Sequence, residues 1–64
     1  MLTNSRDIIR RLEREGWNLV RVTGSHQVLK NAVSWETLAV PTPKKDLGKG
    51  LVRAIYKAAG WKTD

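Results

Sequence analysis

The chain has 64 residues and a mass of 7.2 kDa, and a chain this short forms at most one hydrophobic core. Twelve Lys and Arg residues against six Asp and Glu residues give a formal charge of +6, which indicates a polyanionic partner such as nucleic acid, an acidic protein or a membrane surface. The absence of cysteine excludes disulfide scaffolds, thiol catalysis and cysteine-ligated zinc sites.

Long apolar stretches are missing from the sequence. No run approaches the ~18 apolar residues of a membrane-spanning helix. The opening residues, Met1 to Asp7, contain no apolar segment of the kind found in signal peptides. We therefore expect a single soluble domain over residues 1–64, located in the cytoplasm and without a membrane contact.

The first predicted element is an amphipathic helix over residues 5–15. Asn4 or Ser5 is expected to cap its first turn. Gly16 is expected to follow its last turn, because glycine adopts positive φ without a steric penalty. The apolar positions fall on one face, as packing against a core requires: Ile8, Ile9 and Leu12.

Strands are predicted for the middle of the chain. Gly24-Ser25 is a turn signal between the first two strands. Pro41 ends the third strand, because proline cannot donate a hydrogen bond to a sheet. The alternation of side chains predicts that Trp17 and Leu19 share one face of the first strand, and that Val20 and Val22 share the other. The three strands are expected at residues 17–23, 26–30 and 35–40.

The chain is predicted to finish with a helix that runs from Gly48 or Gly50 to Ala59. A polar loop rich in lysine, residues 41–50, leads into it, and Trp61 is expected to fold back onto the core. Ten side chains are expected to fill that core: Ile8, Ile9, Leu12, Leu19, Val20, Leu38, Val40, Leu51, Val52 and Ile55.

The predicted order of elements is α-β-β-β-α, an α+β fold in which a three-stranded antiparallel sheet packs on two helices. Together with lysines before the last helix, this order resembles the double-stranded-RNA-binding fold. In that family a basic cluster at this place contacts phosphates. Lys44, Lys45 and Lys49 occupy the comparable positions here. The free N–H groups and partial positive charge of a helix N-terminus would add to such an anion site.

His26, directly after the Gly24-Ser25 turn, is the one histidine of the chain. Histidine changes its charge between about pH 5 and 8, so His26 is the strongest acid–base candidate. RNA suits so small a site, because the ribose 2′-hydroxyl is an internal nucleophile next to the phosphate. An enzyme has to remove the hydroxyl proton, stabilise negative charge and protonate the leaving 5′-oxygen. One histidine and several lysines supply part of this chemistry without a metal or another cofactor.

Nearly all of residues 5–61 resembles the HicA family of small toxins, the mRNA interferases of type II toxin–antitoxin systems. Each matching segment is short, but their order and spacing together are specific. The segments are the helix from Ser5 to Leu12, Glu15-Gly16-Trp17, Leu19-Val20-Arg21, Gly24-Ser25-His26, Val40-Pro41, Pro43-Lys44-Lys45-Asp46-Leu47, Lys49-Gly50-Leu51-Val52-Arg53-Ala54-Ile55 and Ala59-Gly60.

The resemblance implies a metal-independent ribonuclease that cleaves mRNA. It gives His26, from the Gly-Ser-His segment, the role of the catalytic residue. It also implies neutralisation by a HicB-type antitoxin that covers the active surface, and an acidic face on that partner would complement the charge of +6.

Further RNA contacts are expected near His26 from Gly24, Ser25 and Lys30. Glycine at position 24 lets RNA approach the backbone closely. Residues 26, 28 and 30 share a strand face, so Lys30 is expected to face RNA together with His26. Trp35 stacks on a base, or it packs against the sheet or against the antitoxin; the sequence leaves these alternatives open.

The sequence departs from the commoner pattern of the family in two places. Many members follow the catalytic histidine with a second histidine and an aromatic residue, whereas Gln27, Val28 and Leu29 follow here. The connection Asn31-Ala32-Val33-Ser34 also lacks the usual His-Pro start. The first departure removes a candidate second acid–base group and an aromatic ring that would stack on a base. The departures also leave the substrate preference open.

Two other functions compete with the ribonuclease hypothesis. The first is a non-catalytic double-stranded-RNA-binding module that uses the same basic surface. The second is an interaction protein whose basic face binds only an acidic partner, and it predicts no affinity for RNA even at low salt. Both RNA-binding hypotheses predict an affinity that falls steeply as salt rises.

Overall fold

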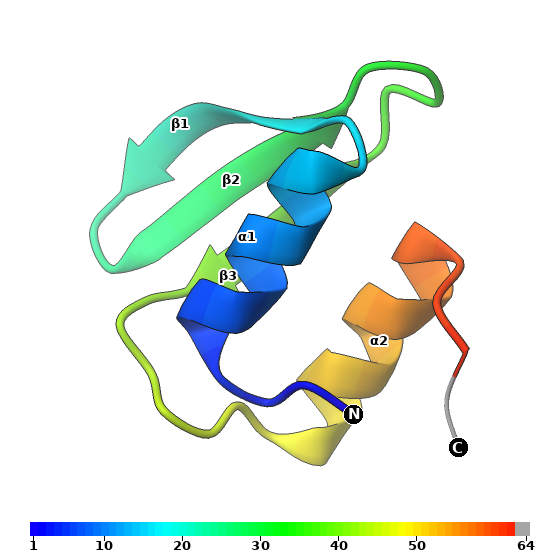
Figure 1. Ribbon diagram of the computed structural model, residues 1–64. Coiled ribbons are helices and arrows are strands. Elements are labelled where there is room, and N and C mark those ends of the chain that lie inside the picture. The colour runs from blue at the N-terminus through cyan, green and yellow to red at the C-terminus, as the bar shows by residue number, and fades with distance from the viewer. Residues whose placement is uncertain (63–64) are drawn as a thin grey trace.

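A computed structural model describes residues 1–62 and shows the predicted order of helices and strands (Figure 1). The third strand begins two residues later than predicted, at Thr37. Trp35 has a φ of 67°, a left-handed conformation that a strand does not contain. The elements are α1 (Ser5–Arg14), β1 (Trp17–Thr23), β2 (His26–Asn31), β3 (Thr37–Pro41) and α2 (Lys49–Ala59).

The three strands form one antiparallel sheet in the order β1-β2-β3, and both helices lie on the same side of it (Figure 1). Leu29 of the central strand is paired with Leu19 of β1 and with Leu38 of β3. The fold is therefore the predicted α+β arrangement, a sheet packed on two helices as in the double-stranded-RNA-binding fold. The outer face of the sheet carries no helix of residues 1–62.

Side-chain caps define the first helix. The Asn4 side chain accepts a hydrogen bond from the backbone N–H of Arg6 at 2.9 Å, which confirms Asn4 as one of the two candidate caps. The helix ends at Arg14, and Gly16 follows with a φ of 95°, a conformation that glycine adopts without strain.

A β-bulge in β1 changes which of its side chains reach the core. The pairing skips Val20, so Leu19 lies opposite Leu29 while Arg21 lies opposite Val28. Val20 and Val22 therefore do not share a face as predicted, because the extra residue reverses the alternation after Leu19. The prediction that Leu19 and Val20 belong to the core is also wrong: they are 45% and 53% exposed.

The core lies between the sheet and the two helices and contains residues that the predicted set lacked. Trp17, Leu29, Leu47, Tyr56 and Trp61 join the buried aliphatic side chains of the helices. Leu38 and Leu51, which were both predicted to be core residues, pack against this cluster and are only partly buried. The core is more aromatic than the predicted set because Trp17 of β1 and Tyr56 of α2 are buried in it together with Trp61.

Trp61 folds back onto the core, as predicted. Its ring meets Tyr56 edge to face, with 5.0 Å between the ring centroids. Its indole N–H donates to Glu15 at 2.7 Å, and the Arg11 guanidinium lies 4.1 Å above its ring centroid. The hydrogen bond from Trp61, with that from Arg11, lowers the pKa of the Glu15 carboxyl. These contacts tie the end of α1 to the residues after α2.

Within residues 1–62, neither helix is long and apolar enough to cross a membrane.

Candidate functional site

His26 is the first residue of β2 and is exposed to solvent. It pairs with Thr23 of β1 and with Pro41 of β3, so it lies at one end of the central strand. The preceding Gly24-Ser25 pair is the two-residue loop of a β-hairpin, and Gly24 has a φ of 58°. This loop suits glycine in its first position. Among the hydrogen bonds of the described residues, none involves the imidazole of this exposed histidine.

The hairpin loop is joined to the loop that carries the predicted lysines. The backbone N–H of Thr42 donates to the carbonyl of Ser25 at 2.6 Å. This bond places the residue before His26 beside the start of the lysine-bearing segment 42–46. Ser25 and Thr42 are 17 residues apart in the sequence, and the pairing of His26 with Pro41 brings them together.

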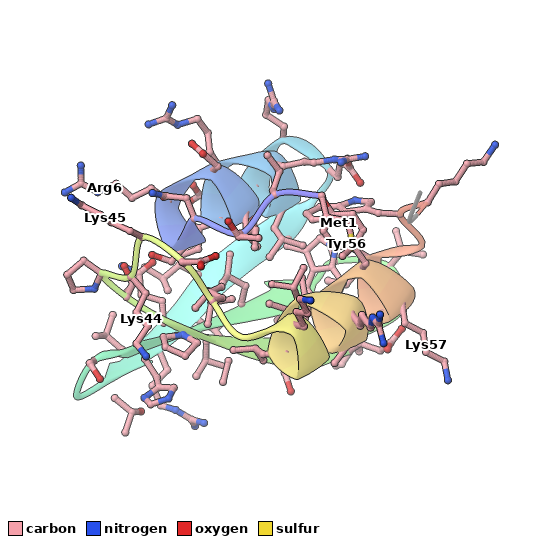
Figure 2. All side chains as sticks on the ribbon, turned by 90° about the horizontal axis from the view of Figure 1, so that it is seen from below. Met1, Arg6, Lys44, Lys45, Tyr56 and Lys57 are labelled. Atoms are coloured by element: carbon pink, nitrogen blue, oxygen red, sulfur yellow. The ribbon has the colours of Figure 1, made fainter. Side chains whose placement is uncertain are left out.

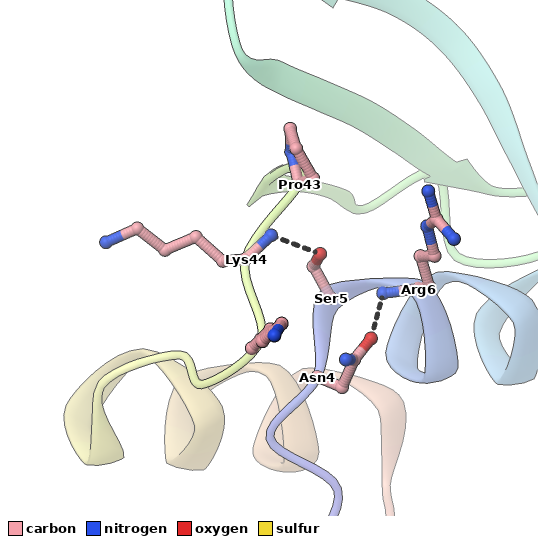
Figure 3. Close-up of a pocket in the computed structure, with 6 residues that line it drawn as sticks. Asn4, Ser5, Arg6, Pro43 and Lys44 are labelled. Atoms are coloured by element: carbon pink, nitrogen blue, oxygen red, sulfur yellow. Dashed lines mark hydrogen bonds between the residues drawn. The ribbon is translucent and has the colours of Figure 1, made fainter.

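A buried serine holds the lysine-bearing loop against α1. The Ser5 hydroxyl accepts a hydrogen bond from the Lys44 N–H at 2.9 Å, and the Ser5 N–H donates to the Lys44 carbonyl, also at 2.9 Å (Figure 3). The Leu47 N–H donates in turn to the carbonyl of Thr3 at 2.8 Å. The sequence predicts for Ser5 only a role as a cap, because nothing in it relates positions 39 residues apart.

A hollow of about 420 Å³ lies between the start of α1 and this loop. The Arg6 guanidinium lines this hollow, although the sequence did not predict Arg6 as a site residue. Lys45 and Arg6 project to the same side of the molecule, Lys44 lies near them, and Lys57 lies at the opposite end (Figure 2). The Lys44 side chain itself extends away from the hollow (Figure 3). The lining residues are Asn4, Ser5, Arg6, Pro43, Lys44 and Lys45.

A second hollow, of about 500 Å³, connects this basic region with the hairpin loop. Arg6 and Arg10 of α1 line it, together with Gly24 and Gln27 at the end of the hairpin. Gly24, predicted as an RNA contact, therefore opens onto a surface that carries two further arginines. The acidic residue that lines this hollow is Glu13.

Two predicted lysines lie apart from the group around His26. Lys49 begins α2, beyond the buried Leu47 that anchors the end of the loop. Lys30 shares the outer sheet face with His26, as predicted, because pairing with β3 is regular from residue 26 to residue 30. Lys30 and His26 are nevertheless four positions apart along the strand, a distance of about 13 Å. The Lys30 ammonium instead lies 4.3 Å above the ring centroid of Trp35.

No group of three or more histidine, cysteine or acidic side chains that could hold a metal ion occurs in the part of the chain that the structure describes.

A family model described as the HicA toxin of bacterial toxin–antitoxin systems matches residues 5–61. The chain belongs to the HicA toxin family. This confirms the resemblance drawn from the short segments between Ser5 and Gly60. A search of curated proteins gives no match.

Among solved structures, the chain is similar to one from a complex titled "HicA3 and HicB3 toxin-antitoxin complex". The two chains are 37% identical, and the TM-score is 0.78. The match covers 95% of this chain and 98% of the other. The HicA toxin fold thus extends over nearly the whole molecule, including the helix–loop–hairpin region around His26.

Proposed function

We propose that this HicA-family chain is an mRNA-cleaving endoribonuclease, in which His26 is the general acid–base and no metal takes part. The observation that carries the proposal is the position of His26 in a chain that matches the HicA toxin family over residues 5–61. His26 is exposed, and the Ser25–Thr42 hydrogen bond joins the residue before it to the start of the loop that carries Lys44 and Lys45.

The chemistry needs only groups that this surface provides. His26 accepts the proton of a ribose 2′-hydroxyl while the 2′-oxygen bonds to the adjacent phosphorus and the bond from phosphorus to the 5′-oxygen breaks. The products are a 2′,3′-cyclic phosphate and a free 5′-hydroxyl. The imidazolium then delivers its proton to the leaving 5′-oxygen, so that His26 ends the cycle in its starting form. Nearby cations stabilise the charge that develops on the phosphate.

We assign RNA binding to the residues around this imidazole. Gly24 and Ser25 present the backbone of the hairpin loop, and the lysine-bearing loop with Arg6 supplies positive charge for phosphates. Lys49 and Lys30 extend the basic surface to the start of α2 and to the far end of β2. The full set is Arg6, Gly24, Ser25, Lys30, Lys44, Lys45 and Lys49.

We further propose that a HicB-type antitoxin neutralises the chain in the cytoplasm. A protein titled as HicB3 assembles with the 37% identical relative. The net charge of +6 would speed association with an acidic partner face. Such a partner inhibits by keeping RNA away from His26.

The decisive experiment compares the purified wild-type chain with His26→Ala on labelled single- and double-stranded RNA. We expect His26→Ala to abolish cleavage while it retains most RNA affinity, because the lysines carry the binding. Gln27→Ala, one residue further along the same strand, is the matched control and should still cleave. Cells that express wild type should lose mRNA and stop growing, whereas cells that express His26→Ala should not.

Each outcome separates the competing functions. Undiminished cleavage by His26→Ala would contradict the assignment of His26. RNA affinity without cleavage by folded wild type would establish the non-catalytic double-stranded-RNA-binding module instead. No affinity even at low salt would leave a protein-interaction domain.

A further inference from the structure

Trp35, in the loop between β2 and β3, combines two unusual properties. Its side chain is 71% exposed, although a large aromatic side chain normally gains stability by burial. Its φ of 67° is the one positive φ among the non-glycine residues of the described chain. For a bulky residue this conformation is strained, and such strain persists mainly at functional positions. Packing does not account for this tryptophan.

The ring is held in place from one side. The Lys30 ammonium lies 4.3 Å above its centroid, in the geometry of a cation–π contact. The Asn31 side chain accepts hydrogen bonds from the N–H groups of Val33 at 2.8 Å and Ser34 at 2.9 Å, which fixes the loop just before the tryptophan. Trp35 is therefore an exposed ring that the loop and a lysine already orient.

A hollow of about 210 Å³ adjoins the ring on the outer face of the sheet. Asn18, Val20 and Lys30 line it together with Trp35, so its wall carries an apolar side chain, an amide and a cation. Val20 lies on this face because it alternates with Asn18, which is paired with Lys30. An apolar floor with an amide and a cation at its edge suits a nucleobase and its neighbouring phosphate.

The same sheet face leads from Trp35 to His26. Lys30 and His26 are both on it, about 13 Å apart along β2, and the register places Arg21 and Thr37 on it as well. No strand residue on this face is acidic; Glu36 lies in the loop outside the strands. A polyanion can therefore follow β2 without meeting a negative side chain of the sheet.

We infer that Trp35 and Lys30 form a stacking site for one unpaired base of a single-stranded RNA segment, whose backbone runs along the outer face of β2 toward His26. The inference rests on the proposed RNA-cleaving function and names its substrate class. The second face of the indole receives the base, while Lys30 on the first face attracts the adjoining phosphate. Stacking is tolerant of sequence, so the site selects unpaired RNA rather than a particular base.

Tryptophan fluorescence tests the contact directly. Trp17 and Trp61 are buried, so an added ligand that stacks on Trp35 changes mainly the emission of the exposed indole. The probe is a single-stranded 2′-O-methyl oligoribonucleotide, which lacks the 2′-hydroxyl and stays intact whether or not the chain is a nuclease. We expect quenching that saturates with the strand and is much weaker with a duplex of equal length. Equal quenching by strand and duplex would overturn the inference.

Two variants separate stacking from a structural role. Trp35→Asn removes the ring and places a residue that tolerates positive φ, so we expect an unchanged or higher melting temperature and a loss of affinity of roughly 5- to 150-fold, the range for one base–aromatic stack. Trp35→Phe keeps a ring and should retain most of the affinity. A lower melting temperature for Trp35→Asn with unchanged affinity would show that the ring serves stability and would contradict the inference.

Other occupants of the surface give different results. If Trp35→Asn keeps its RNA affinity but no longer co-purifies with a HicB-type antitoxin, the ring is an antitoxin contact. If the wild-type chain is a dimer by light scattering and Trp35→Asn is a monomer, the ring joins two copies. Either result overturns the stacking site. Failure of His26→Ala to abolish cleavage would refute the proposed chemistry but would leave these binding measurements intact.

Discussion

Ser5 shows how one small side chain positions the cationic loop. It is fully buried, and its backbone and hydroxyl both bond to Lys44. The hydroxyl also donates to the Thr42 hydroxyl at 3.5 Å, and the backbone N–H of the same Thr42 donates to the Ser25 carbonyl. Through this chain of bonds, the first residue of α1 sets the distance between the lysines and the hairpin loop that ends at His26.

We predict that Ser5→Ala lowers the free energy of unfolding by about 1–3 kcal/mol, because it leaves the Lys44 N–H without its acceptor. It should also weaken RNA binding, because the loop loses the bond to the hydroxyl and keeps only its backbone bonds. Thermal unfolding and RNA titration check both effects. Ser34→Ala, the same change in an exposed loop, is the control and should cost clearly less, because its hydroxyl accepts only the exposed Glu36 N–H at 3.3 Å. Equal stability of wild type and Ser5→Ala would contradict the role of the hydroxyl.

The strands are the elements in which local pattern and tertiary structure diverge. Leu19 and Leu29 are cross-strand partners, yet Leu29 is fully buried under the helices while Leu19 is 45% exposed. Alternation alone cannot tell a central strand from an edge strand. The β1 bulge makes the prediction harder still, because no feature of the sequence marks the residue that the bulge inserts.

This pair gives a prediction about the core. Leu29→Ala should cost about 2–5 kcal/mol of unfolding free energy, because it leaves a cavity at the centre of the sheet. Leu19→Ala should cost clearly less, although the sequence analysis placed Leu19 in the core. Chemical denaturation of the two variants measures the difference. Similar losses would show that the edge strand is buried as deeply as the central one.

The contact between Glu15 and Trp61 predicts a dependence on pH. The hydrogen bond lowers the pKa of Glu15 in the folded chain below its value in the unfolded chain, so the ionised carboxylate stabilises the fold. This stabilisation is present above the ordinary glutamate pKa of about 4.3 and is lost as pH falls through the lowered value. Glu15→Gln should therefore melt below wild type at pH 7, and the gap should close toward pH 3. A gap that is constant across this range would refute the linkage.

At the scale of the whole molecule, three of the twelve Lys and Arg side chains lie together at one place. Arg6, Lys44 and Lys45 lie around the start of α1, while Lys57 lies at the opposite end (Figure 2). A polyanion that binds by releasing counterions shows an affinity that falls with salt, in proportion to the number of phosphates contacted. We therefore expect the placement of the cations, rather than the net charge of +6 alone, to determine which lysines contribute to RNA affinity.

We predict that Lys44→Ala and Lys45→Ala each reduce the slope of log affinity against log salt by about 0.7 to 1, the value for one lost phosphate contact. Lys57→Ala removes the same charge from the far end and should leave the slope unchanged. RNA titrations between low and physiological salt measure these slopes. Equal effects of all three variants would indicate that only net charge matters.

The sequence by itself determined the order of elements, the ends of α1, the return of Trp61 and the membership in the HicA family. Caps, turn glycines and helical periodicity act over a few residues, so they can be read without the fold. The tertiary structure decided that Ser5 holds the lysine loop, that Arg6 joins the basic surface, and that Leu19 and Val20 leave the core. These features depend on the sheet register, the bulge and hydrogen bonds between residues far apart in the chain, and local sequence preferences do not encode them.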